Sequence, residues 1–453
     1  MNINPGIFKA YDIRGIYGKD FDEKHAYQIA QAYIKVIKPK GTVAVGMDVR
    51  LSSSKIKRSV IKGLTDAGIN VLDIGLSSTE MYYFAVGYYK LAGGIQVTAS
   101  HNPKEYNGFK MVKRDVEPIH KDNGIHQIRD LVAAKPQPVI RSRKGSVKKI
   151  NVLDDFCRFA IAFLDQDKTQ PKTIVINPNF GYEGEVVKRF VKLHKLPWKL
   201  IGLNDKPDGT FPKGRPDPFV PENRPEFEAL TKSSGADLGV AWDADADRVF
   251  FCDDKGRFIE SYYTNHLLIR SLLEKRKGEK IVYDPRYTWA LTDAAKEMKG
   301  KAVLERVGHS YIKERMRKEN AIFSGESSGH TYFRDFWFAD TGLLPVLVLM
   351  NLLNHTGKKM SQLIEPVMKK YPMSGEINSI VEDPKKVTLN IEKLYKKGGK
   401  INKLDGLSIE FKDWRFNLRE SNTEPLLRLN VEGKNKAIVS QKTKELLKII
   451  RSK

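Results

Sequence analysis

Residues 42–50 read TVAVGMDVR, a short run of apolar residues that ends in polar ones. A helical stretch follows from Ser54 to Ala67, and residues 70–75, NVLDIG, form a second apolar run. A short, continuous apolar strand is typical of a sheet that is covered on both faces. Residues 42–75 therefore predict a strand–loop–helix–strand unit, the building block of an α/β domain.

The same order of elements recurs twice in this chain of 453 residues, which is long for one core. Residues 173–179, TIVINPN, and residues 281–286, IVYDPR, each precede a helical stretch and another strand. After Gly406 the pattern changes to short strands and a basic helix, which indicates an α+β fold. We expect three similar α/β domains with mixed sheets and a C-terminal α+β domain. The expected domains are 1–146, 147–254, 255–370 and 371–453, with linkers near 135–149, 253–256 and 371–375.

Composition narrows the class of protein. The two cysteines, Cys157 and Cys252, lie far apart, so we expect no disulfide framework and a reducing cytosol. The N-terminus lacks a basic stretch followed by an apolar signal region, so we expect no export. The longest apolar run, residues 342–353, is too short to span a bilayer and predicts a buried core helix. We therefore expect a cytoplasmic protein without a membrane partner.

The net charge of +23 would attract anions, whether nucleic acid, anionic lipid or phosphorylated metabolites. The lysines are spread along the whole chain, with the densest runs at 141–149 and 396–403. Neither run is interleaved with aromatic residues like a groove for single-stranded nucleic acid. We favour a lysine-rich solvated surface and disfavour nucleic acid as a partner. A non-catalytic protein that binds anionic sugars or nucleic acid stays open as the alternative to an enzyme.

Residues 93–110, GGIQVTASHNPKEYNGFK, place a serine at the end of a predicted buried strand. The carboxyl ends of such strands are where α/β sheets hold their functional sites. His101 and Lys110 put cationic groups near Ser100, as a phosphorylated hydroxyl requires. A single serine in a turn would be an ordinary loop residue, but the run TASHNP with NGFK downstream favours a functional role.

Residues 241–250, AWDADADRVF, carry Asp243, Asp245 and Asp247 on a tight loop. Three carboxylates so close together repel one another unless they are hydrated or a cation neutralises them. Oxygen ligands favour Mg²⁺, which keeps open positions for phosphate oxygens. An EF-hand loop is disfavoured because apolar residues follow at once and the final glutamate is missing. A solvated acidic turn is disfavoured because apolar strands flank the loop.

Two further loops carry polar groups that are only suggestive when taken singly. Residues 323–330, FSGESSGH, present short polar groups that suit hydrogen bonds to sugar hydroxyls. Residues 419–425, RESNTEP, combine Arg419 with hydroxyls and turn N–H groups, which would make a phosphate cradle. An ordinary turn would be the better interpretation of either loop in isolation.

Taken together, the motifs FKAYDIRG, TASHNP, DxDxDR, GExSGH and RxSNTEP resemble the α-D-phosphohexomutases, over residues 8 to about 435. Segments such as YDPRYTW and GHSYIKERMRKE look most like bacterial phosphomannomutases, which serve GDP-mannose synthesis. N-acetylglucosamine- and glucosamine-phosphate mutases rank lower, because they usually have glycine in place of Asn422. Phosphoglucomutase or dual specificity stays open, because mannose and glucose differ only at C2.

The resemblance implies four domains around a central active-site cleft, each donating a loop. It implies phosphorylated hexoses as substrates, hexose 1,6-bisphosphate as activator, and a monomer or homodimer. It also implies that Ser100 is a phosphoserine whose phosphate oxygen, with Asp243, Asp245 and Asp247, holds Mg²⁺. The residues implied around the transferring group are Arg14, His101, Lys110, Arg248 and His330, with His101 or His330 as general base. The residues implied in substrate binding are Tyr11, Arg286, Gly308, His309, Glu326, Ser328, Arg419, Ser421, Asn422 and Thr423.

Two positions depart from the family pattern. The acidic loop commonly has glycine between its aspartates, whereas Ala244 and Ala246 occupy both gaps here. An alanine would be strained at either position if the loop requires a positive φ there. Ser327 stands where a methionine is frequent, which leaves the sugar preference open.

Overall fold

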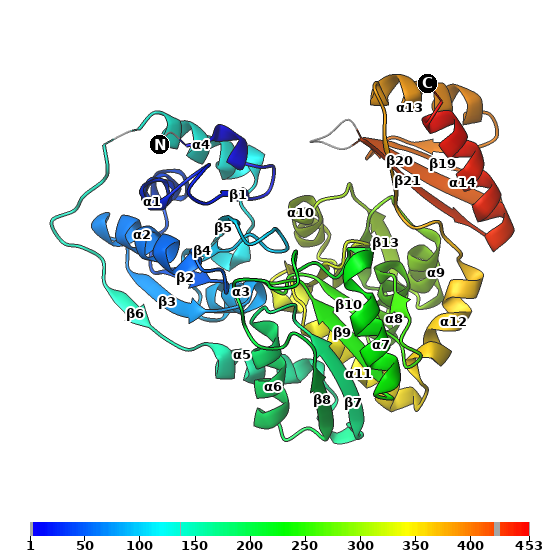
Figure 1. Cartoon of the computed structure of the whole chain (residues 1–453), viewed down its shortest axis with the longest axis horizontal. Helices are drawn as coiled ribbons and strands as arrows, with labels where there is room; N and C mark the ends of the chain where they lie inside the picture. The colour runs from blue at the N-terminus through cyan, green and yellow to red at the C-terminus, as the bar shows by residue number, and fades with distance from the viewer. Residues whose placement is uncertain (1–2, 136, 421–425, 453) are drawn as a thin grey trace. The chain divides into compact units, whose positions relative to one another are not determined.

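The computed structural model describes residues 3–135, 137–420 and 426–452 (Figure 1). The chain divides into two compact units. The first consists of residues 1–259 with 328–359, and the second of residues 260–327 with 360–453. The chain therefore crosses between the units within the loop that contains Glu326 and Ser328.

The first sheet combines parallel and antiparallel strands. Its order is β1 (Ile13–Ile16), β5 (Tyr106–Lys113), β4 (Gly93–Val97), β2 (Val43–Met47), β3 (Val71–Leu76) and β6 (Val147–Lys149). Strands β4, β2, β3 and β6 are parallel, whereas β5 is antiparallel to both β1 and β4. The carboxyl ends of β2, β3 and β4 therefore meet at one edge of the sheet.

Four helices accompany this sheet: α1 (Glu23–Ile37), α2 (Ser53–Asp66), α3 (Thr79–Tyr88) and α4 (His126–Ala133). Helix α1 begins after Asp22, whose side chain accepts a hydrogen bond from His25 N. Helices α1 and α2 approach closely at Gly63, where an added Cβ would lie 2.8 Å from the carbonyl oxygen of Tyr27. A continuous apolar core, including Tyr33, lies beneath these helices.

The second sheet of the first unit has the order β11 (Phe258–Ile259), β10 (Val249–Cys252), β9 (Leu238–Trp242), β7 (Lys172–Asn177) and β8 (Trp198–Gly202). Its helices are α5 (Leu153–Ala160), α6 (Glu183–Leu193) and α7 (Pro225–Ser233). The unit also contains the antiparallel pair β15 (Thr331–Phe333) and β16 (Ala339–Asp340) and helix α11 (Leu344–Thr356). Most of α11 is buried, which confirms the predicted core helix.

The second unit contains parallel strands and a separate antiparallel sheet. Strand β12 (Lys280–Tyr283) pairs in parallel with β13 (Lys301–Leu304) and β14 (Phe323–Gly325). Its helices are α8 (Ser261–Glu274), α9 (Trp289–Glu297), α10 (His309–Glu319) and α12 (Met360–Lys370). The C-terminal sheet has the order β17 (Ile377–Ile380), β21 (Leu426–Gly433), β20 (Trp414–Glu420), β19 (Leu407–Glu410) and β18 (Lys400–Asn402). Helices α13 (Pro384–Tyr395) and α14 (Lys436–Ile450) complete this part.

The predicted fold class is confirmed, with three α/β domains followed by an α+β C-terminal domain. Two predicted linkers are wrong in part. The stretch 135–149 includes strand β6, which continues the first sheet past the expected boundary at residue 146. All three residues of β6 are exposed, so no apolar pattern marks it. Residues 253–256 lie in the turn of the hairpin between β10 and β11 rather than in a linker.

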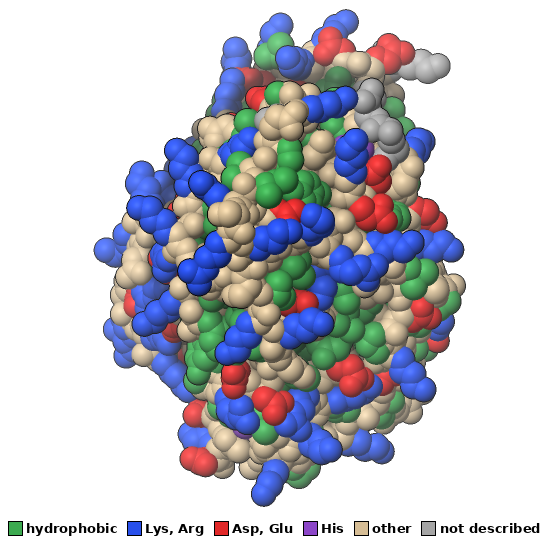
Figure 2. Space-filling view, turned by 90° about the vertical axis from the view of Figure 1, so that its left-hand side faces the viewer, with side chains coloured by type: hydrophobic (Ala, Val, Ile, Leu, Met, Phe, Trp, Pro, Cys, Tyr) green, Lys and Arg blue, Asp and Glu red, His purple; other side chains and the backbone are tan. Residues whose placement is uncertain are grey.

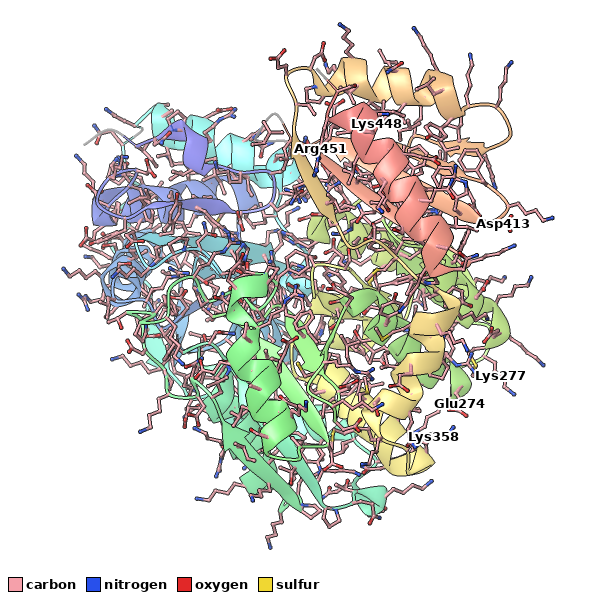
Figure 3. All side chains as sticks on the ribbon, turned by 45° about the vertical axis from the view of Figure 1, so that its right-hand side comes forward. Glu274, Lys277, Lys358, Asp413, Lys448 and Arg451 are labelled. Carbon is pink, nitrogen blue, oxygen red and sulfur yellow. The ribbon has the colours of Figure 1, made fainter. Side chains whose placement is uncertain are left out.

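The basic residues are widely distributed over the surface. On the face in Figure 2, Lys and Arg side chains stand among acidic, apolar and neutral ones. Figure 3 shows Lys277, three residues beyond α8, and Lys448 on α14, far apart on the second unit. This distribution agrees with a solvated lysine-rich surface. Among the described residues, no helix is both long and apolar enough to cross a bilayer.

Candidate active site

Parallel strands bring polar residues to one edge of the first sheet. Asp48 follows β2, Thr79 starts α3 shortly after β3, and Thr98 and Ser100 follow β4. Because these strands are parallel, their carboxyl ends lie side by side, which is where an α/β sheet presents functional groups. Ser100 itself has a φ of 49°, in the left-handed region that non-glycine residues seldom adopt.

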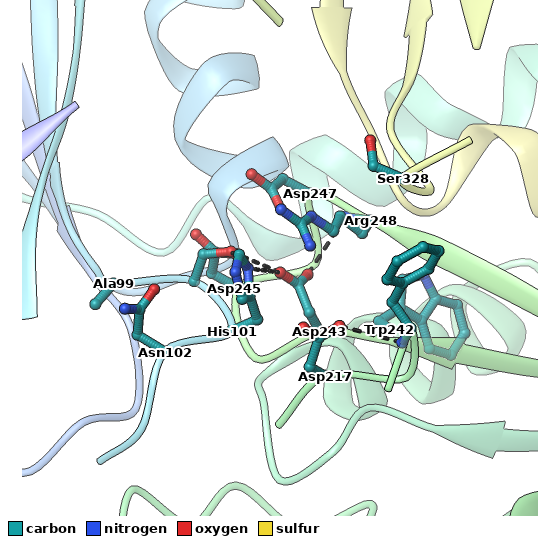
Figure 4. A network of polar contacts seen from close by, with 12 residues as sticks. Ala99, His101, Asn102, Asp217, Trp242, Asp243, Asp245, Asp247, Arg248 and Ser328 are labelled. Carbon is teal, nitrogen blue, oxygen red and sulfur yellow. Dashed lines mark hydrogen bonds and ion pairs between the residues drawn. The ribbon is translucent and has the colours of Figure 1, made fainter. Parts of the chain in front are cut away.

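The turn between β9 and β10 supplies the acidic residues that face Ser100. The Ser100 hydroxyl donates a hydrogen bond to Asp243 Oδ2 at 2.7 Å, and His101 Nδ1 lies 3.0 Å from the same hydroxyl. Figure 4 shows the His101, Asp243 and Arg248 side chains turned toward one another. Arg248 contributes its backbone N–H to Asp243 Oδ1 at 3.3 Å. The predicted serine and the predicted acidic loop therefore meet, although they are far apart in sequence.

Asp245 is held by three donors from the first domain. Its Oδ2 accepts hydrogen bonds from Thr79 Oγ1 at 2.7 Å, Thr98 Oγ1 at 3.0 Å and Lys110 Nζ at 2.7 Å. Lys110 also forms an ion pair with Asp247. Burial lowers the pKa of Lys110, but Asp245 and Asp247 more than offset this and raise the pKa above its ordinary value. Lys110 is therefore a fixed positive charge beside the acidic loop.

The acidic loop concentrates negative charge that Lys110 does not fully compensate. Burial and the Asp247 and Asp245 carboxylates raise the pKa of Asp243 well above its ordinary value. Burial also acts to raise the pKa of Asp247, but Lys110 and His330 hold it well below the ordinary range. A cation beside this loop would relieve the repulsion that Asp243 experiences.

The residues of the loop fit a divalent metal ion. Asp243, Asp245 and Asp247 each offer an oxygen, and these oxygens lie within 4.8 Å of one another. Oδ1 of Asp245 and Oδ1 of Asp247 are buried and have no hydrogen-bond partner in the described part of the chain. A set of oxygen donors of this kind suits Mg²⁺. The expected metal ligands therefore supply a set of donors that fits a magnesium ion.

One of the two alanines in this loop adopts the conformation for which glycine is favoured. Ala246 has a φ of 58°, and its side chain is buried. Such a conformation costs an L-residue other than glycine about 1–2 kcal/mol. Ala244 is not among the residues with positive φ. The predicted strain therefore applies to Ala246 alone.

Cationic residues surround the Ser100 turn. Arg14 Nη1 donates to Asn102 Oδ1 at 3.0 Å, while its Nε contacts Asp12 Oδ2 at 2.6 Å. Burial and the positive charges of Arg248 and Arg14 lower the pKa of His101 well below its ordinary value. Burial and these arginines therefore favour the neutral form of the His101 imidazole.

His330 lies between two polar groups of the first unit. Its Nδ1 is 3.1 Å from Ser328 Oγ, and its Nε2 is 3.5 Å from Asp247 Oδ2. Asp247, His330 and Asp340 also offer three ligand atoms within 4.8 Å of one another. Ser328 and His330 were both expected at the site, whereas Asp340, at the end of β16, was missed because no motif contains it.

In the second unit, Arg286 and Glu326 form a buried network. Arg286 Nε and Nη2 donate to the two carboxylate oxygens of Asp284 at 3.0 and 2.8 Å. Arg286 Nη2 also lies 3.3 Å from Glu326 Oε1. Arg286 was expected among the substrate-binding residues, and its guanidinium is engaged by these carboxylates. Arg286 is therefore placed to orient the carboxylate of Glu326.

The C-terminal sheet presents a second cationic site. Arg419 on β20 lies directly opposite Arg428 on β21. Arg428 Nη1 lies 3.3 Å from Glu376 Oε1, and Arg419 Nε lies 4.0 Å from Asp405 Oδ2. Burial and the positive charges of Arg286 and Arg428 lower the pKa of Arg419. An anion at this position would offset the repulsion between the guanidinium groups.

The remaining expected substrate-binding residues are placed as follows. Gly308, with a φ of 134°, precedes α10, and His309 is the first residue of that helix. Val307 N donates to Asp405 Oδ2 at 2.9 Å, so this turn lies near Arg419. Tyr11 is partly buried and immediately precedes Asp12. The expected residues Ser421, Asn422 and Thr423 lie outside the described residues.

Sequence comparison agrees with this arrangement over the whole chain. Models of the phosphoglucomutase/phosphomannomutase α/β/α domains I, II and III match residues 5–138, 154–256 and 260–371, and the model of the C-terminal domain matches 376–449. A phosphomannomutase from Salmonella montevideo is 42% identical over 455 residues, covering 99% of this chain and 100% of the relative. A phosphomannomutase from Vibrio cholerae serotype O1 is 43% identical, covering 98% of each chain.

A solved structure shares the same fold throughout. The crystal structure of a phosphoglucomutase/phosphomannomutase family protein from Burkholderia thailandensis superposes with a TM-score of 0.88 at 30% identity, covering 99% of this chain and 98% of that one. The family models and these relatives define an enzyme that moves a phosphoryl group on a sugar. The chain belongs to the phosphoglucomutase/phosphomannomutase family and is a phosphohexomutase, an isomerase of carbohydrate metabolism. The expectation of an enzyme, rather than a non-catalytic binding protein, is confirmed.

Proposed function

We propose that the enzyme interconverts mannose 6-phosphate and mannose 1-phosphate, with Ser100 carrying the transferred phosphoryl group. The observation that carries this proposal is the position of Ser100 Oγ, 2.7 Å from Asp243 Oδ2 and 3.0 Å from His101 Nδ1. The names of the relatives with 42 and 43% identity support mannose as the sugar. Mannose 1-phosphate formed in this way would enter GDP-mannose synthesis.

The reaction consists of two phosphoryl transfers. In the first, the free hydroxyl oxygen of the hexose monophosphate attacks the phosphorus on Ser100, and the bond from phosphorus to Ser100 Oγ breaks. The sugar hydroxyl loses its proton, and a proton is delivered to Ser100 Oγ. In the second, the other phosphate of the hexose 1,6-bisphosphate returns to Ser100 by the reverse steps. Between the two transfers the bisphosphate must turn end over end.

Two histidines are assigned to the proton transfers. His101 lies within hydrogen-bond distance of Ser100 Oγ, so it is suited to exchange a proton with the serine. His330 is held from both sides by Ser328 and Asp247, so its ring orientation is fixed. We assign to His330 the role of accepting the proton of the sugar hydroxyl. Each histidine then has one role.

Residues of the first unit are assigned to stabilise the negative charge on the transferring phosphoryl group. Lys110, Arg14 and Arg248 supply fixed positive charge near Ser100. The three aspartates of the acidic loop, with an oxygen of the Ser100 phosphate, would hold Mg²⁺, which supplies further positive charge against the phosphoryl oxygens. The rigid hydrogen bonds to Asp245 from Thr79 and Thr98 keep this loop in position.

Residues of the second unit are assigned to the rest of the substrate. Arg419, with Arg428 beside it, is suited to bind the phosphate that is not reacting. Glu326, oriented by Arg286, is suited to accept hydrogen bonds from sugar hydroxyls. The Gly308–His309 turn would add contacts to the same sugar. Hexose 1,6-bisphosphate is the expected activator, because it can phosphorylate Ser100 and start the cycle.

A coupled assay tests this assignment directly. Initial rates would be measured with mannose 1-phosphate and with glucose 1-phosphate, each with Mg²⁺ and hexose 1,6-bisphosphate present. We expect the higher kcat/KM for mannose 1-phosphate. A clear preference for glucose 1-phosphate would make the enzyme a phosphoglucomutase, and similar values would make it a dual-specificity enzyme. No turnover of either sugar phosphate would overturn the proposed function.

A further inference from the structure

The turn that carries Ser100 has an unusual backbone that needs support. Ser100 adopts a φ of 49°, which L-residues other than glycine seldom hold without help from their surroundings. The following residues, 101–105, form no helix or strand before β5 begins at Tyr106. Within the turn, Ser100 N donates to Thr98 Oγ1 at 2.9 Å, and Asn102 N donates to Ala99 O at 3.0 Å. The carbonyl oxygens of Ser100 and Asn102 are bound instead by a side chain from outside the turn.

Arg50 provides this support through its two terminal nitrogens. Nη2 donates to the carbonyl oxygens of Ser100 at 2.7 Å and Asn102 at 2.6 Å. Nη1 donates to the carbonyl oxygens of Pro103 at 2.6 Å and Tyr106 at 3.1 Å. A single guanidinium thus forms hydrogen bonds to carbonyl groups at both ends of the turn. A planar fork of fixed donors determines the relative positions of its acceptors.

Arg50 is itself held rigidly. Its Nε donates to Asp48 Oδ2 at 3.1 Å, and Asp48 Oδ1 accepts from Arg50 N at 3.0 Å and from Ser53 Oγ at 2.6 Å. The guanidinium carbon lies 5.0 Å from the centre of the Phe211 ring, and Arg50 is only 2% exposed. The chain at Arg50 also forms a β-bridge to Gly209. The support of the Ser100 turn is therefore anchored to β2 and to the second domain at once.

We propose that Arg50 is a positioning residue for phosphoryl transfer, which holds Ser100 in its left-handed conformation so that Oγ faces Asp243. This inference rests on the proposed role of Ser100 as the phosphoryl carrier. Arg50 does not act on the sugar, because its donors are already occupied by backbone carbonyls and by Asp48. Its effect should therefore appear in the rate of phosphoryl transfer rather than in substrate affinity.

Lysine cannot replace this arginine, although it keeps the charge. One ammonium group cannot reach carbonyl oxygens on both sides of the turn with the geometry of a guanidinium fork. A displacement of the reacting serine by about 1 Å costs about 100-fold in rate. We therefore expect Arg50→Lys to lower kcat about 100-fold, with KM for the hexose phosphate changed less than threefold.

Transfer to the enzyme would be measured directly. Wild-type protein and Arg50→Lys would be mixed with glucose 1,6-bisphosphate and Mg²⁺ and quenched at short times. Mass spectrometry of the Ser100 peptide would then give the rate of phosphorylation. Hydrogen exchange of the Asn102 and Tyr106 amides, which donate within the turn, would report the turn's order independently of activity. We expect slow phosphorylation and faster amide exchange in Arg50→Lys.

Two further variants separate positioning from stability. Lys57→Met removes another buried cation of the same domain, which lies on α2 and pairs with Asp73 on β3 at 2.7 Å. We expect it to lower the melting temperature while leaving the phosphorylation rate unchanged. Asp48→Asn loosens the anchor of Arg50 but keeps its shape. It should slow phosphorylation less than Arg50→Lys does. It replaces Arg50→Lys as the test variant if Arg50→Lys does not fold.

The outcomes distinguish the inference from the proposed function. If the wild-type Ser100 peptide gains no phosphate, the phosphoserine mechanism itself is wrong. If wild-type Ser100 is phosphorylated and Arg50→Lys, or Asp48→Asn in its place, reacts at the wild-type rate, the positioning role of Arg50 is overturned. If Lys57→Met is phosphorylated as slowly as Arg50→Lys, the positioning role of Arg50 is also overturned, because general destabilisation would then be the cause.

Discussion

Arg419 and Arg428 lie directly opposite each other on the neighbouring strands β20 and β21. Like charges in directly opposed positions of an antiparallel sheet destabilise the sheet. The Nε atoms of both arginines are buried and have no hydrogen-bond partner within the described ranges. Asp405 and Glu376 lie beside these arginines, and the pair would also suit a ligand with several negative oxygens, such as a phosphate group.

Replacing Arg419 by alanine should weaken substrate binding more than it slows turnover. The proposed contact to the distal phosphate exists in the ground state and in the transition state alike, so its loss should raise KM more than it lowers kcat. We expect a loss of about 2–3 kcal/mol in kcat/KM. The variant should also release measurable hexose 1,6-bisphosphate and depend more on added bisphosphate, because the intermediate loses an anchor.

Lys400→Ala is the matched control, since Lys400 is an exposed cation on β18 of the same sheet. It should leave KM unchanged. An unchanged KM in Arg419→Ala, with no extra bisphosphate released, would move the phosphate-binding role to Arg428.

Replacing Ser100 by alanine should abolish turnover while the protein stays folded. The hydroxyl contributes hydrogen bonds with Asp243 and His101, and little packing. Circular dichroism should show an unchanged fold, and no product should form even with added bisphosphate. Wild-type activity in purified Ser100→Ala would rule out the phosphoserine mechanism.

Removal of divalent metal should stop the reaction. The acidic loop holds buried carboxylate oxygens without hydrogen-bond partners among the described residues, which suits a small cation. After chelation, Mg²⁺ should restore activity better than Ca²⁺, whose larger and looser coordination shell positions oxygens less tightly. Full activity after exhaustive chelation would remove Asp243, Asp245 and Asp247 from the catalytic site.

Stability in acid should depend on Asp66, at the end of α2. Hydrogen bonds from Lys62, and with smaller effect from Lys144 and Tyr27, lower the pKa of Asp66 to about 2. Because the folded pKa lies below the unfolded one, the stabilisation is present above about pH 4 and is lost as pH falls toward 2. Both lysines are largely exposed, so solvent screening limits the effect to about 1 kcal/mol at pH 7.

Asp66→Asn should therefore be less stable than wild type at pH 7, and the difference should vanish near pH 2. Urea unfolding at several pH values measures this directly. A difference that is constant with pH would show that Asp66 acts through packing rather than through its charge.

The fold was largely predictable because its first strands have a clear apolar pattern. The runs that became β2, β7 and β12 were each recognised with the helix and strand that follow. Strand β6 was missed because it is exposed along its whole length and is held by backbone pairing to β3, which leaves no pattern in its side chains. The hairpin at 253–256 was mistaken for a linker because a polar turn and a polar linker have the same composition.

Part of the candidate site could not be predicted from the sequence. The acidic loop and Ser100 were recognised as motifs, but the contacts of Thr79 and Thr98 with Asp245 depend on two domains meeting. Arg50 ends the run TVAVGMDVR, where it resembles any polar residue after a strand, and its contacts with the Ser100 turn require the tertiary fold. The positive φ of Ala246 likewise follows from the loop's geometry rather than from a sequence pattern.

The central claim is that Ser100 carries the phosphoryl group that is exchanged with the sugar. The most direct test is to phosphorylate the enzyme with labelled glucose 1,6-bisphosphate, remove excess reagent, and add unlabelled mannose 1-phosphate with Mg²⁺. Mass spectrometry and product analysis would follow the label. We predict one labelled phosphate per chain, on the Ser100 peptide, which moves into hexose phosphate within the time of one turnover. A label that is absent from Ser100, or that stays on Ser100 while the sugar turns over, would contradict the account.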